Sequence, residues 1–446
     1  MRVPGALTPA VAATVEAARY VALEKLRGVF AEACASAGCS AEPLLAFERW
    51  RWSCKAAEEA RRATIAAAAA AAARLLSKNA RKRARAKAAK AARTDPLLPA
   101  GEDEETHEQN LVADLLRAGA AADGARAAAA QLARASKAAA AQVAELERQL
   151  QDGTAPVAKV RVEWHRHSVD LSVVGRKLRV TLLREAYARL LAMHARASPD
   201  EAAADESVVD EAGATLSEPD EKKERTALHC RLIALLLRYK AIRGHGFQAA
   251  VGPHAMDLLL SECSVGIEMF ASPLNARLPA FCSAFTDVDA PFGSCGSAFA
   301  LNPEDAPKGE AIGIEVNPPF VVDILDRAAE RVGKMLEAAV RDERSLTMVA
   351  FYPGWTDCAG WQALSGSPHL RRSVLIAAAD HGYCDGAAFQ RRDPFRASPY
   401  DTTVFFLQSP RAARDSPLPE GLEARLRAAM AEARPTVAAA ARQAGK

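Results

Sequence analysis

The four residues from Asn317 to Phe320, Asn-Pro-Pro-Phe, carry groups that could hold an adenine amine for methylation. The lone pair of that amine is delocalised into the ring, so both N–H bonds must be held before the lone pair can turn toward a methyl donor. The Asn317 side-chain oxygen and the Pro318 carbonyl can accept these bonds, and the two prolines fix φ and remove competing N–H donors. Phe320 can stack on the base, a contact worth about 1–3 kcal/mol. The motif predicts adenine N6 methylation with Asn317, Pro318, Pro319 and Phe320 as catalytic residues, although a Pro-Pro pair is also an ordinary strand stop.

The elements that must position this motif alternate between strand and helix. The pattern predicts a strand that ends at Val316 and a helix over 321–340. Such alternation is typical of a mostly parallel, doubly wound sheet, in which ligands lie outside the carboxyl ends of the strands. Further strands are expected over 265–270, 347–352, 373–378 and 402–407. This arrangement would bring 270–275, 317–320 and 352–355 around one crevice.

The turn after the expected strand 265–270 is the candidate site for the methyl donor. It lacks a glycine-rich GxGxxG pattern, but small Ala271 and Ser272 allow close approach of the backbone to a ligand. An acidic residue near the next strand end is a reasonable acceptor for ribose hydroxyls, although an ordinary polar turn is the alternative. The candidate cofactor-binding residues are therefore Ala271, Ser272, Pro273, Asn275 and Asp289.

Length and composition set limits on the class of protein. A chain of 446 residues can form two or three domains, and a net charge of +3 does not by itself indicate nucleic-acid binding. The nine cysteines include no CxxC pair, so no structural zinc is expected, and such scattered cysteines suit a reducing compartment. Charged residues interrupt the N-terminal segment, and the apolar run 66–73 is too short for a bilayer. The composition predicts a soluble intracellular protein without metal or membrane.

The composition changes along the chain and predicts four regions. Residues 1–155 are Ala-rich, and because alanine buries little area they are expected to form helical arms with a thin core. Residues 156–255 should form a helical domain with a short hairpin and an acidic insertion, 198–224, whose composition is typical of disorder. The alternating core spans 256–412, and a C-terminal helical tail is expected over 413–446.

A basic run between residues 78 and 93 contains eight lysines and arginines. It is consistent with a nuclear import signal, with contacts to a phosphate backbone, or with a solvated helix face. The first reading predicts location in the nucleus.

Several motifs occur in one order along the chain and resemble the phosphorylated-CTD-interacting-factor family. They are LLRYKAI at 236–242, MFASPLN at 269–275, FCSAFTDVDAPFGS at 281–294, VNPPF at 316–320, FYPGW at 351–355 and TTVFFLQS at 402–409. Members of this family are cap-specific adenosine N6-methyltransferases of messenger RNA. The resemblance covers about residues 160–410. It implies an α/β fold in which a helical domain packs on a Rossmann-like methyltransferase core, with S-adenosyl-L-methionine as donor and capped mRNA as partner. The implied substrate is the 2′-O-methylated adenosine next to the 7-methylguanosine cap.

Some residues depart from the family pattern. Animal members begin with a WW domain that reads the polymerase tail, whereas Trp50 and Trp52 lie here in a helical context, so binding to the RNA polymerase II machinery is left open. Gly354 stands where the family has an acidic residue. A 7-methylguanine ring is cationic and cations bind aromatic faces, so Tyr352 and Trp355 are candidate substrate-binding residues, with a place in the core as the alternative.

Two other functions share features of this sequence. An N6-adenine methyltransferase of DNA or internal RNA would use the same residues 317–320. A non-catalytic scaffold would bind partners through the helical arms, but it has no use for the Asn-Pro-Pro-Phe motif.

Overall fold

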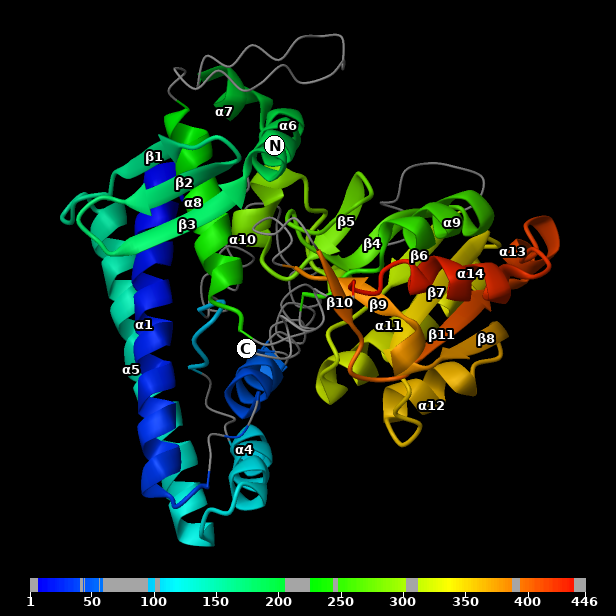
Figure 1. The fold of residues 1–446 in the computed structure, drawn as a ribbon, viewed down its shortest axis with the longest axis horizontal. Helices are drawn as coiled ribbons and strands as arrows, with labels where there is room; N and C mark the ends of the chain where they lie inside the picture. The colour runs from blue at the N-terminus through cyan, green and yellow to red at the C-terminus, as the bar shows by residue number, and fades with distance from the viewer. Residues whose placement is uncertain are drawn as a thin grey trace, which may run out of the picture. The chain divides into compact units, whose positions relative to one another are not determined.

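The computed structural model describes residues 7–40, 43, 45–55, 57–58, 95–100, 105–204, 225–243, 248–301, 312–386 and 394–436. They form two compact units. The sheet unit comprises Met1–Ala12, Lys159–Leu236 and His245–Lys446, and the helical unit comprises Ala13–Ala158 and Leu237–Gly244. The elements of both units are labelled in Figure 1. None of the helices in the described part of the chain combines the length and the apolarity needed to cross a membrane.

The core of the sheet unit is a mixed sheet whose six strands run in the order β5-β4-β6-β7-β11-β8. The first four are parallel, and β11 is antiparallel to both of its neighbours. The strands are β4 (Val265–Ala271), β5 (Ala280–Ser283), β6 (Ile312–Val316), β7 (Leu346–Pro353), β8 (Leu370–Ile376) and β11 (Thr402–Gln408). The predicted α/β class with a parallel-rich sheet is confirmed, and the strand missing from the prediction is the short β5.

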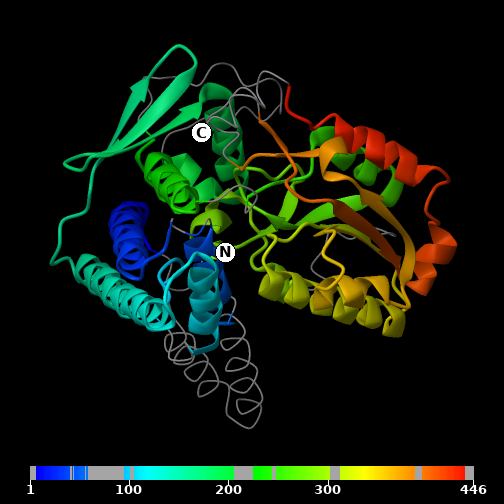
Figure 2. The ribbon, with the colours of Figure 1, turned by 60° about the horizontal axis from the view of Figure 1, so that its bottom comes forward.

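Helices cover both faces of this sheet (Figure 2). On one face α11 (Val322–Arg341) buries Leu325, Val332 and Leu336, and α12 (Ala359–Ser365) packs beside it. On the other face lie α9 (Pro253–Cys263) and α14 (Leu422–Ala431). Residues 413–446 were expected to form a tail, but Leu422, Leu426 and Met430 are fully buried in the core against α9. Helix α14 therefore completes the second face of the sheet, and α13 (Pro410–Asp415) precedes it.

A second, antiparallel sheet of three strands precedes the core in sequence. Its strands are β1 (Val160–Trp164), β2 (Ser168–Val173) and β3 (Leu178–Leu183), so the short hairpin expected in this region has a third strand, and β3 leads directly into α6 (Arg184–Ala197). The Thr181 hydroxyl, three residues before this helix, donates to Asp170 Oδ1 across the sheet. Helix α7 (Pro199–Ala204) occupies the start of the segment 198–224, whose residues 205–224 lie outside the described residues.

Short elements complete the sheet unit. Helix α8 (Thr226–Lys240) runs from this unit into the helical unit. The strands β9 (Gly382–Cys384) and β10 (Phe395–Ala397) pair with each other. The remaining turns are α10 (Thr286–Asp289), η1 (Ala290–Phe292), η2 (Ala298–Ala300) and η4 (Ala378–Asp380).

The helical unit is compact rather than a set of extended arms. It contains α1 (Pro9–Ser36), α4 (Glu105–Arg117), α5 (Ala122–Gln151) and helical residues 46–55, which include Trp50 and Trp52. Alanines on α5 are buried as expected, but larger side chains fill the core between the helices, among them Leu23, Phe30, Phe47, Leu115 and Leu132. These residues bury enough apolar area to hold the helices together. The basic run 78–93 lies outside the described residues.

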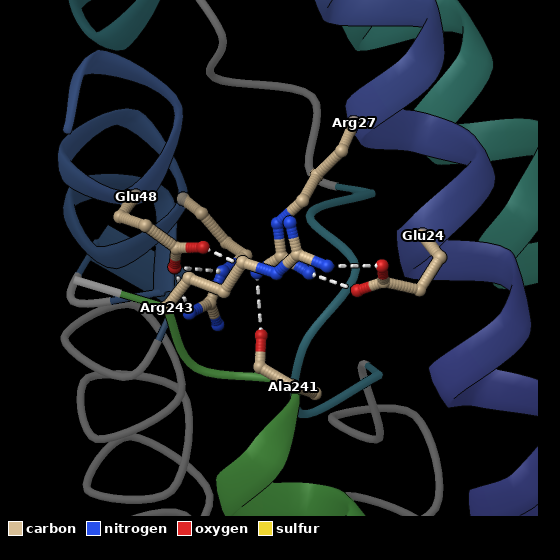
Figure 3. A network of polar contacts seen from close by, with 6 residues as sticks. Glu24, Arg27, Glu48, Ala241 and Arg243 are labelled. Atoms are coloured by element: carbon tan, nitrogen blue, oxygen red, sulfur yellow. Dashed lines mark hydrogen bonds and ion pairs between the residues drawn. The ribbon is translucent and has the colours of Figure 1, made fainter. Parts of the chain in front are cut away.

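Buried ion pairs also hold the helical unit together. Figure 3 shows Arg27 between Glu24 and Glu48, with its guanidinium donating to the Ala241 carbonyl at 2.6 Å. Burial raises the pKa of Glu48, but the charges of Arg51 and Arg27 outweigh this effect and lower the pKa below its ordinary value. On α8, Arg238 forms a bidentate pair with Glu16 at 2.7 and 2.8 Å, and both side chains are at most 1% exposed. Residues 237–243 are thereby fixed to α1 through charge as well as apolar contact.

Candidate functional site

The Asn-Pro-Pro-Phe motif begins immediately after β6, at the point where the strand order of the sheet changes direction. Strand β4 has β5 on one side and β6 on the other, all parallel. In open α/β sheets, ligands bind at such a switch point, outside the carboxyl ends of the strands. The turn 271–275 follows β4, and Asn317 follows β6. The structure therefore brings the candidate donor turn and the candidate base-binding motif to one edge of the sheet.

Residues 248–250, which we call the strap, tie the two strand ends together. The Asn317 side-chain amide donates to the Ala249 carbonyl at 3.1 Å, and the Asn275 amide donates to the Gln248 carbonyl at 3.1 Å. Ala250 is held in turn by two backbone hydrogen bonds to Cys384 of β9. With the amide nitrogen of Asn317 fixed on the strap, its Oδ1 accepts no hydrogen bond from the described residues. That oxygen is positioned to accept from a ligand.

Asn275 has a different role from the one predicted. Its Oδ1 accepts from the Ser272 backbone at 2.8 Å and from the Ser272 hydroxyl at 2.9 Å, while its amide is bound to the strap. The side chain closes the turn after β4 and is committed to it, so the structure does not support donor contacts through its amide. Ser272 and Pro273 are buried in the same turn, and Ala271 is half-buried at the strand end.

Asp289 is fully buried, which the polar texture of its segment did not indicate. Its Oδ2 accepts from the Phe285 backbone N–H at 3.1 Å and closes the first turn of α10. Only Oδ2 makes this contact, and the contact of the Asp289 carboxylate with the ribose of the donor stays a prediction. Asp287, two residues earlier, is exposed on the same turn and is the better candidate.

Four aromatic rings gather beside the motif. Phe320 lies with its ring centroid 6.2 Å from Trp355, 6.3 Å from Tyr383 and 6.5 Å from Tyr400, and Trp355 lies 5.1 Å from Tyr400. Phe320 and Trp355 are half-buried and Tyr400 is 43% exposed, so the cluster is open on one side. Such a cluster can stack a base or hold a cationic ring.

Tyr352 does not belong to this cluster. Its ring is fully buried in the core, and its hydroxyl donates to the Leu325 carbonyl of α11 at 2.8 Å. The predicted role in substrate binding is not supported, because the alternating side chains of β7 place Tyr352 on the α11 face of the sheet.

Tyr383, Tyr400 and the strap were not predicted from the sequence. Tyr400 precedes β11, and because β11 is antiparallel its first residues lie at the same sheet edge as the carboxyl end of β7. A prediction that β11 runs antiparallel to β7 would have placed Tyr400 at this edge of the sheet. Nothing in the sequence signals the strap, whose position depends on two distant asparagines.

Two acidic side chains lie beneath the site, in register on neighbouring strands. Glu268 of β4 pairs with Glu315 of β6, two residues before Asn317, and each is 2% exposed. Burial raises the pKa of Glu268, although backbone N–H groups of Leu278 and Arg277, both 2.6 Å from Oε1, partly offset it. Burial, with repulsion from Glu268, raises the pKa of Glu315 well above 4.5. In the sequence, the signal for this pair is a glutamate within each of two otherwise apolar strands.

The raised pKa of Glu315 predicts a specific dependence of stability on pH. A carboxyl group whose pKa is raised by folding stabilises the folded state fully below its unfolded pKa, near 4.5, and less as pH rises toward the folded pKa. Each unit of raised pKa corresponds to about 1.4 kcal/mol. We expect Glu315→Gln to gain stability relative to the wild type between pH 5 and pH 8, measured by urea unfolding. Glu330→Gln, which removes an exposed carboxylate from α11, is the control. An equal difference between Glu315→Gln and the wild type at both pH values would contradict the prediction.

Comparison with known proteins confirms the resemblance predicted from the motifs. A family model described as the phosphorylated CTD interacting factor 1 WW domain matches residues 214–386. A mouse and a human protein, both named mRNA (2′-O-methyladenosine-N(6)-)-methyltransferase, are 29% and 28% identical to the chain over 204 residues. The matches cover 43% of this chain and 28% of each relative. The chain therefore corresponds to less than a third of the length of these relatives.

Proposed function

We propose that this protein is an S-adenosyl-L-methionine-dependent N6-methyltransferase that acts on the 2′-O-methylated adenosine next to the mRNA cap. The observation that carries the proposal is the position of Asn317 at the switch point. Its amide is fixed on the Ala249 carbonyl, so its oxygen can face a ligand beside the aromatic ring of Phe320. The names of the mouse and human relatives support this substrate. The parallel-rich sheet supports a Rossmann-like methyltransferase core.

The residues at the edge of β4 and β5 fit the proposed donor. The methyl side chain of Ala271 leaves room at the strand end, and the turn behind it is held rigidly by Asn275. The exposed carboxylate of Asp287 stands where ribose hydroxyls are commonly bound. S-adenosyl-L-methionine supplies an activated methyl group when bound. The chain itself binds and orients this donor through the backbone at 271–273 and through Asp287.

The base is held on the other side of the switch point. The Asn317 oxygen and the Pro318 carbonyl accept hydrogen bonds from the two N6–H groups, so the nitrogen can become pyramidal and its lone pair turns from the ring π system toward the methyl donor. The Pro319 carbonyl is already bound to the Val321 N–H at 2.7 Å, which fixes the backbone after the prolines. Phe320 then stacks on the base. In this arrangement the rate depends on positioning and fixed dipoles rather than on a strong base.

The proposal is tested with labelled donor and matched RNAs that begin with adenosine. One RNA carries the cap and the 2′-O-methyl group, and the others lack one or both. Transfer only to the capped RNA is expected. Equal transfer to uncapped RNA or to DNA would favour a methyltransferase of DNA or internal RNA instead. Failure to bind the donor in calorimetry would favour a non-catalytic scaffold.

Phe320 provides a separate prediction. Because stacking is worth about 1–3 kcal/mol, Phe320→Ala should lower transfer about 5–150-fold, while Phe320→Tyr should keep most of it. The measurement is kcat/KM for the capped RNA, with donor affinity as the control for folding. Equal activity of the Ala and Tyr variants would argue against stacking.

Location and partners follow from the same reaction. We propose capped mRNA as the partner and the nucleus as the compartment. We make no proposal for the RNA polymerase II machinery, since the match to the family model covers residues 214–386 and not the tryptophans of the helical unit. Of the four regions expected from the sequence, we retain only the boundaries that coincide with those of the two compact units.

A further inference from the structure

The three-stranded sheet β1–β3 has one buried face and one polar face. Its buried face carries Val162, Leu171 and Val180, which pair across the strands, and Trp164 packs edge-on against Tyr187 of α6 at 5.0 Å. The other face carries Arg161, Ser172 and Arg179 in one row. The next row holds Glu163, Asp170 and Thr181. The core of the unit does not require this second face, which we call the outer face.

Positive charge dominates the outer face and the turns at its two ends. Residues 159–184 contain seven lysines and arginines but only two acidic residues, Glu163 and Asp170. Asp170 is already neutralised, because it accepts from Thr181 and His165 and lies 3.2 Å from Arg179. With both oxygens engaged and an arginine beside it, Asp170 does not favour a metal cation. Glu163 is the one remaining acidic group on this face.

Most of the cations on this sheet are available to a partner. In the part of the chain that the structure describes, five of them form no ion pair, and all five are exposed: Lys159, Arg161, Arg166, Arg176 and Lys177. Arg184, by contrast, donates to the His165 carbonyl at 2.8 Å and covers the Trp164 ring. Like charges held together repel one another, so a surface of this kind gains free energy when it binds a polyanion.

The sheet is joined rigidly to the candidate site. Helix α6 begins at the residue after β3, so no linker separates them. From α6, Arg189 donates to the Ala276 carbonyl at 2.7 Å and to the Pro273 carbonyl, and burial lowers the pKa of its guanidinium. The Ser198 hydroxyl donates to the Pro291 carbonyl at 3.2 Å. These contacts hold the sheet against the turns after β4 and β5, so a chain bound on it has a fixed relation to the site.

We propose that the outer face of β1–β3, with the turns 165–167 and 174–177, binds the phosphate backbone of the RNA beyond its methylated end. This inference rests on the proposed function, because it takes the RNA substrate from it. Six-residue strands are about 20 Å long, which leaves room for several nucleotides. Arginine forks bind phosphate oxygens, and such contacts position a nucleic acid without reading its sequence. The exposed residues of the strands β1–β3 include no Phe, Tyr or Trp ring for base stacking, so binding should depend little on sequence and strongly on salt.

The test compares two triple variants with the same change in net charge. Arg166→Ala/Arg176→Ala/Lys177→Ala removes exposed cations from the two turns, and it breaks no side-chain hydrogen bond or ion pair among the described residues. Arg134→Ala/Lys137→Ala/Arg341→Ala removes three exposed cations elsewhere and is the matched control. Binding is measured by fluorescence anisotropy, without methyl donor, for a capped 20-nucleotide RNA and a capped dinucleotide over a series of salt concentrations.

The expected result is a loss of affinity for the long RNA in the first triple variant alone. The slope of log affinity against log salt should decrease in magnitude by about 0.7 for each lost phosphate contact, hence by about 2 for three contacts. The two triple variants should bind the capped dinucleotide with equal affinity. Equal losses in both variants, or no loss in either, would overturn the inference. An acidic peptide that binds as tightly as RNA, and equally depends on the three cations, would overturn it in favour of a protein partner.

The outcome separates this inference from the proposed function. If the wild type methylates capped RNA but the long RNA binds no more tightly than the dinucleotide, the surface inference fails and the function stands. If the long RNA binds through the three cations but no transfer occurs to any RNA, the proposed function fails and the phosphate-binding surface stands.

Discussion

Replacing Asn317 with alanine is expected to lower methyl transfer about 10²–10³-fold, while the protein stays folded and still binds its methyl donor. The variant loses one of the two acceptors that hold the adenine amine, and removal of one such preorganised polar contact commonly has an effect of this size. Within the described residues the Asn317 side chain makes one hydrogen bond, to the Ala249 carbonyl, and the loss of one such bond is too small to unfold the sheet unit. Single-turnover kinetics with capped RNA measures the loss, and calorimetry measures donor affinity.

Asn275 provides a matched comparison, because both asparagines donate to consecutive carbonyls of the strap. The Asn275 oxygen, however, also accepts two hydrogen bonds from Ser272. Asn275→Ala should therefore lower the melting temperature and weaken donor binding, since it removes three contacts from a buried turn. A variant at Asn317 that turns over like the wild type, or one that behaves like Asn275→Ala in melting, would remove Asn317 from its proposed role.

Replacing Glu16 with methionine is expected to destabilise the helical unit by about 3–5 kcal/mol. The substitution removes the Glu16 carboxylate from the buried Arg238 guanidinium, and breaking a buried ion pair by removing one partner has a cost of this order. Glu16 and Arg238 are 1% and 0% exposed, so water cannot replace the lost partner. Urea unfolding followed by tryptophan fluorescence measures the change, since Trp50 and Trp52 are buried in the same unit.

Two further variants make this prediction specific. The double variant Glu16→Met/Arg238→Met removes both charges and should recover much of the lost stability, because apolar side chains of similar volume can replace a buried pair. Arg19 keeps Asp95 as a partner at 2.8 Å in either variant. Glu145→Ala breaks an exposed pair with Arg148 and should leave the stability nearly unchanged. If Glu16→Met and Glu16→Met/Arg238→Met were equally unstable, poorer packing of the new side chains, rather than the unpaired charge, would be the cause.

Local patterns in the sequence were sufficient to predict most elements of the sheet unit. The strands that end at Val316 and start near Thr347 have apolar runs bounded by turn residues, and α11 has apolar side chains at helical spacing. The Asn-Pro-Pro-Phe motif could be read in the same way, because its chemistry depends on four consecutive residues. The switch point then followed from the rule that relates ligand sites to strand order.

By contrast, the local sequence could not predict which polar side chains are buried or which groups they bind. Asp289, Tyr352 and Asn275 were each predicted to bind a ligand, and in the structure each also makes a hydrogen bond within the fold that no local pattern indicated. The sequence of helix α14 alone suggests a tail, whereas in the structure its leucines pack in the core with residues of α9. Alanine content suggested a thin core in the helical unit, but the buried Arg238, paired with the distant Glu16, adds to its stability.

The physical reason is the range of the interactions concerned. Helix and strand patterns, turns and the motif at Asn317 depend on neighbours within a few residues, so the sequence by itself determined them. Whether Oδ1 of an asparagine faces a ligand or a serine depends on which carbonyl lies opposite its amide. For Asn317 that carbonyl belongs to Ala249, 68 residues earlier in the chain, and only the tertiary structure could bring the two together.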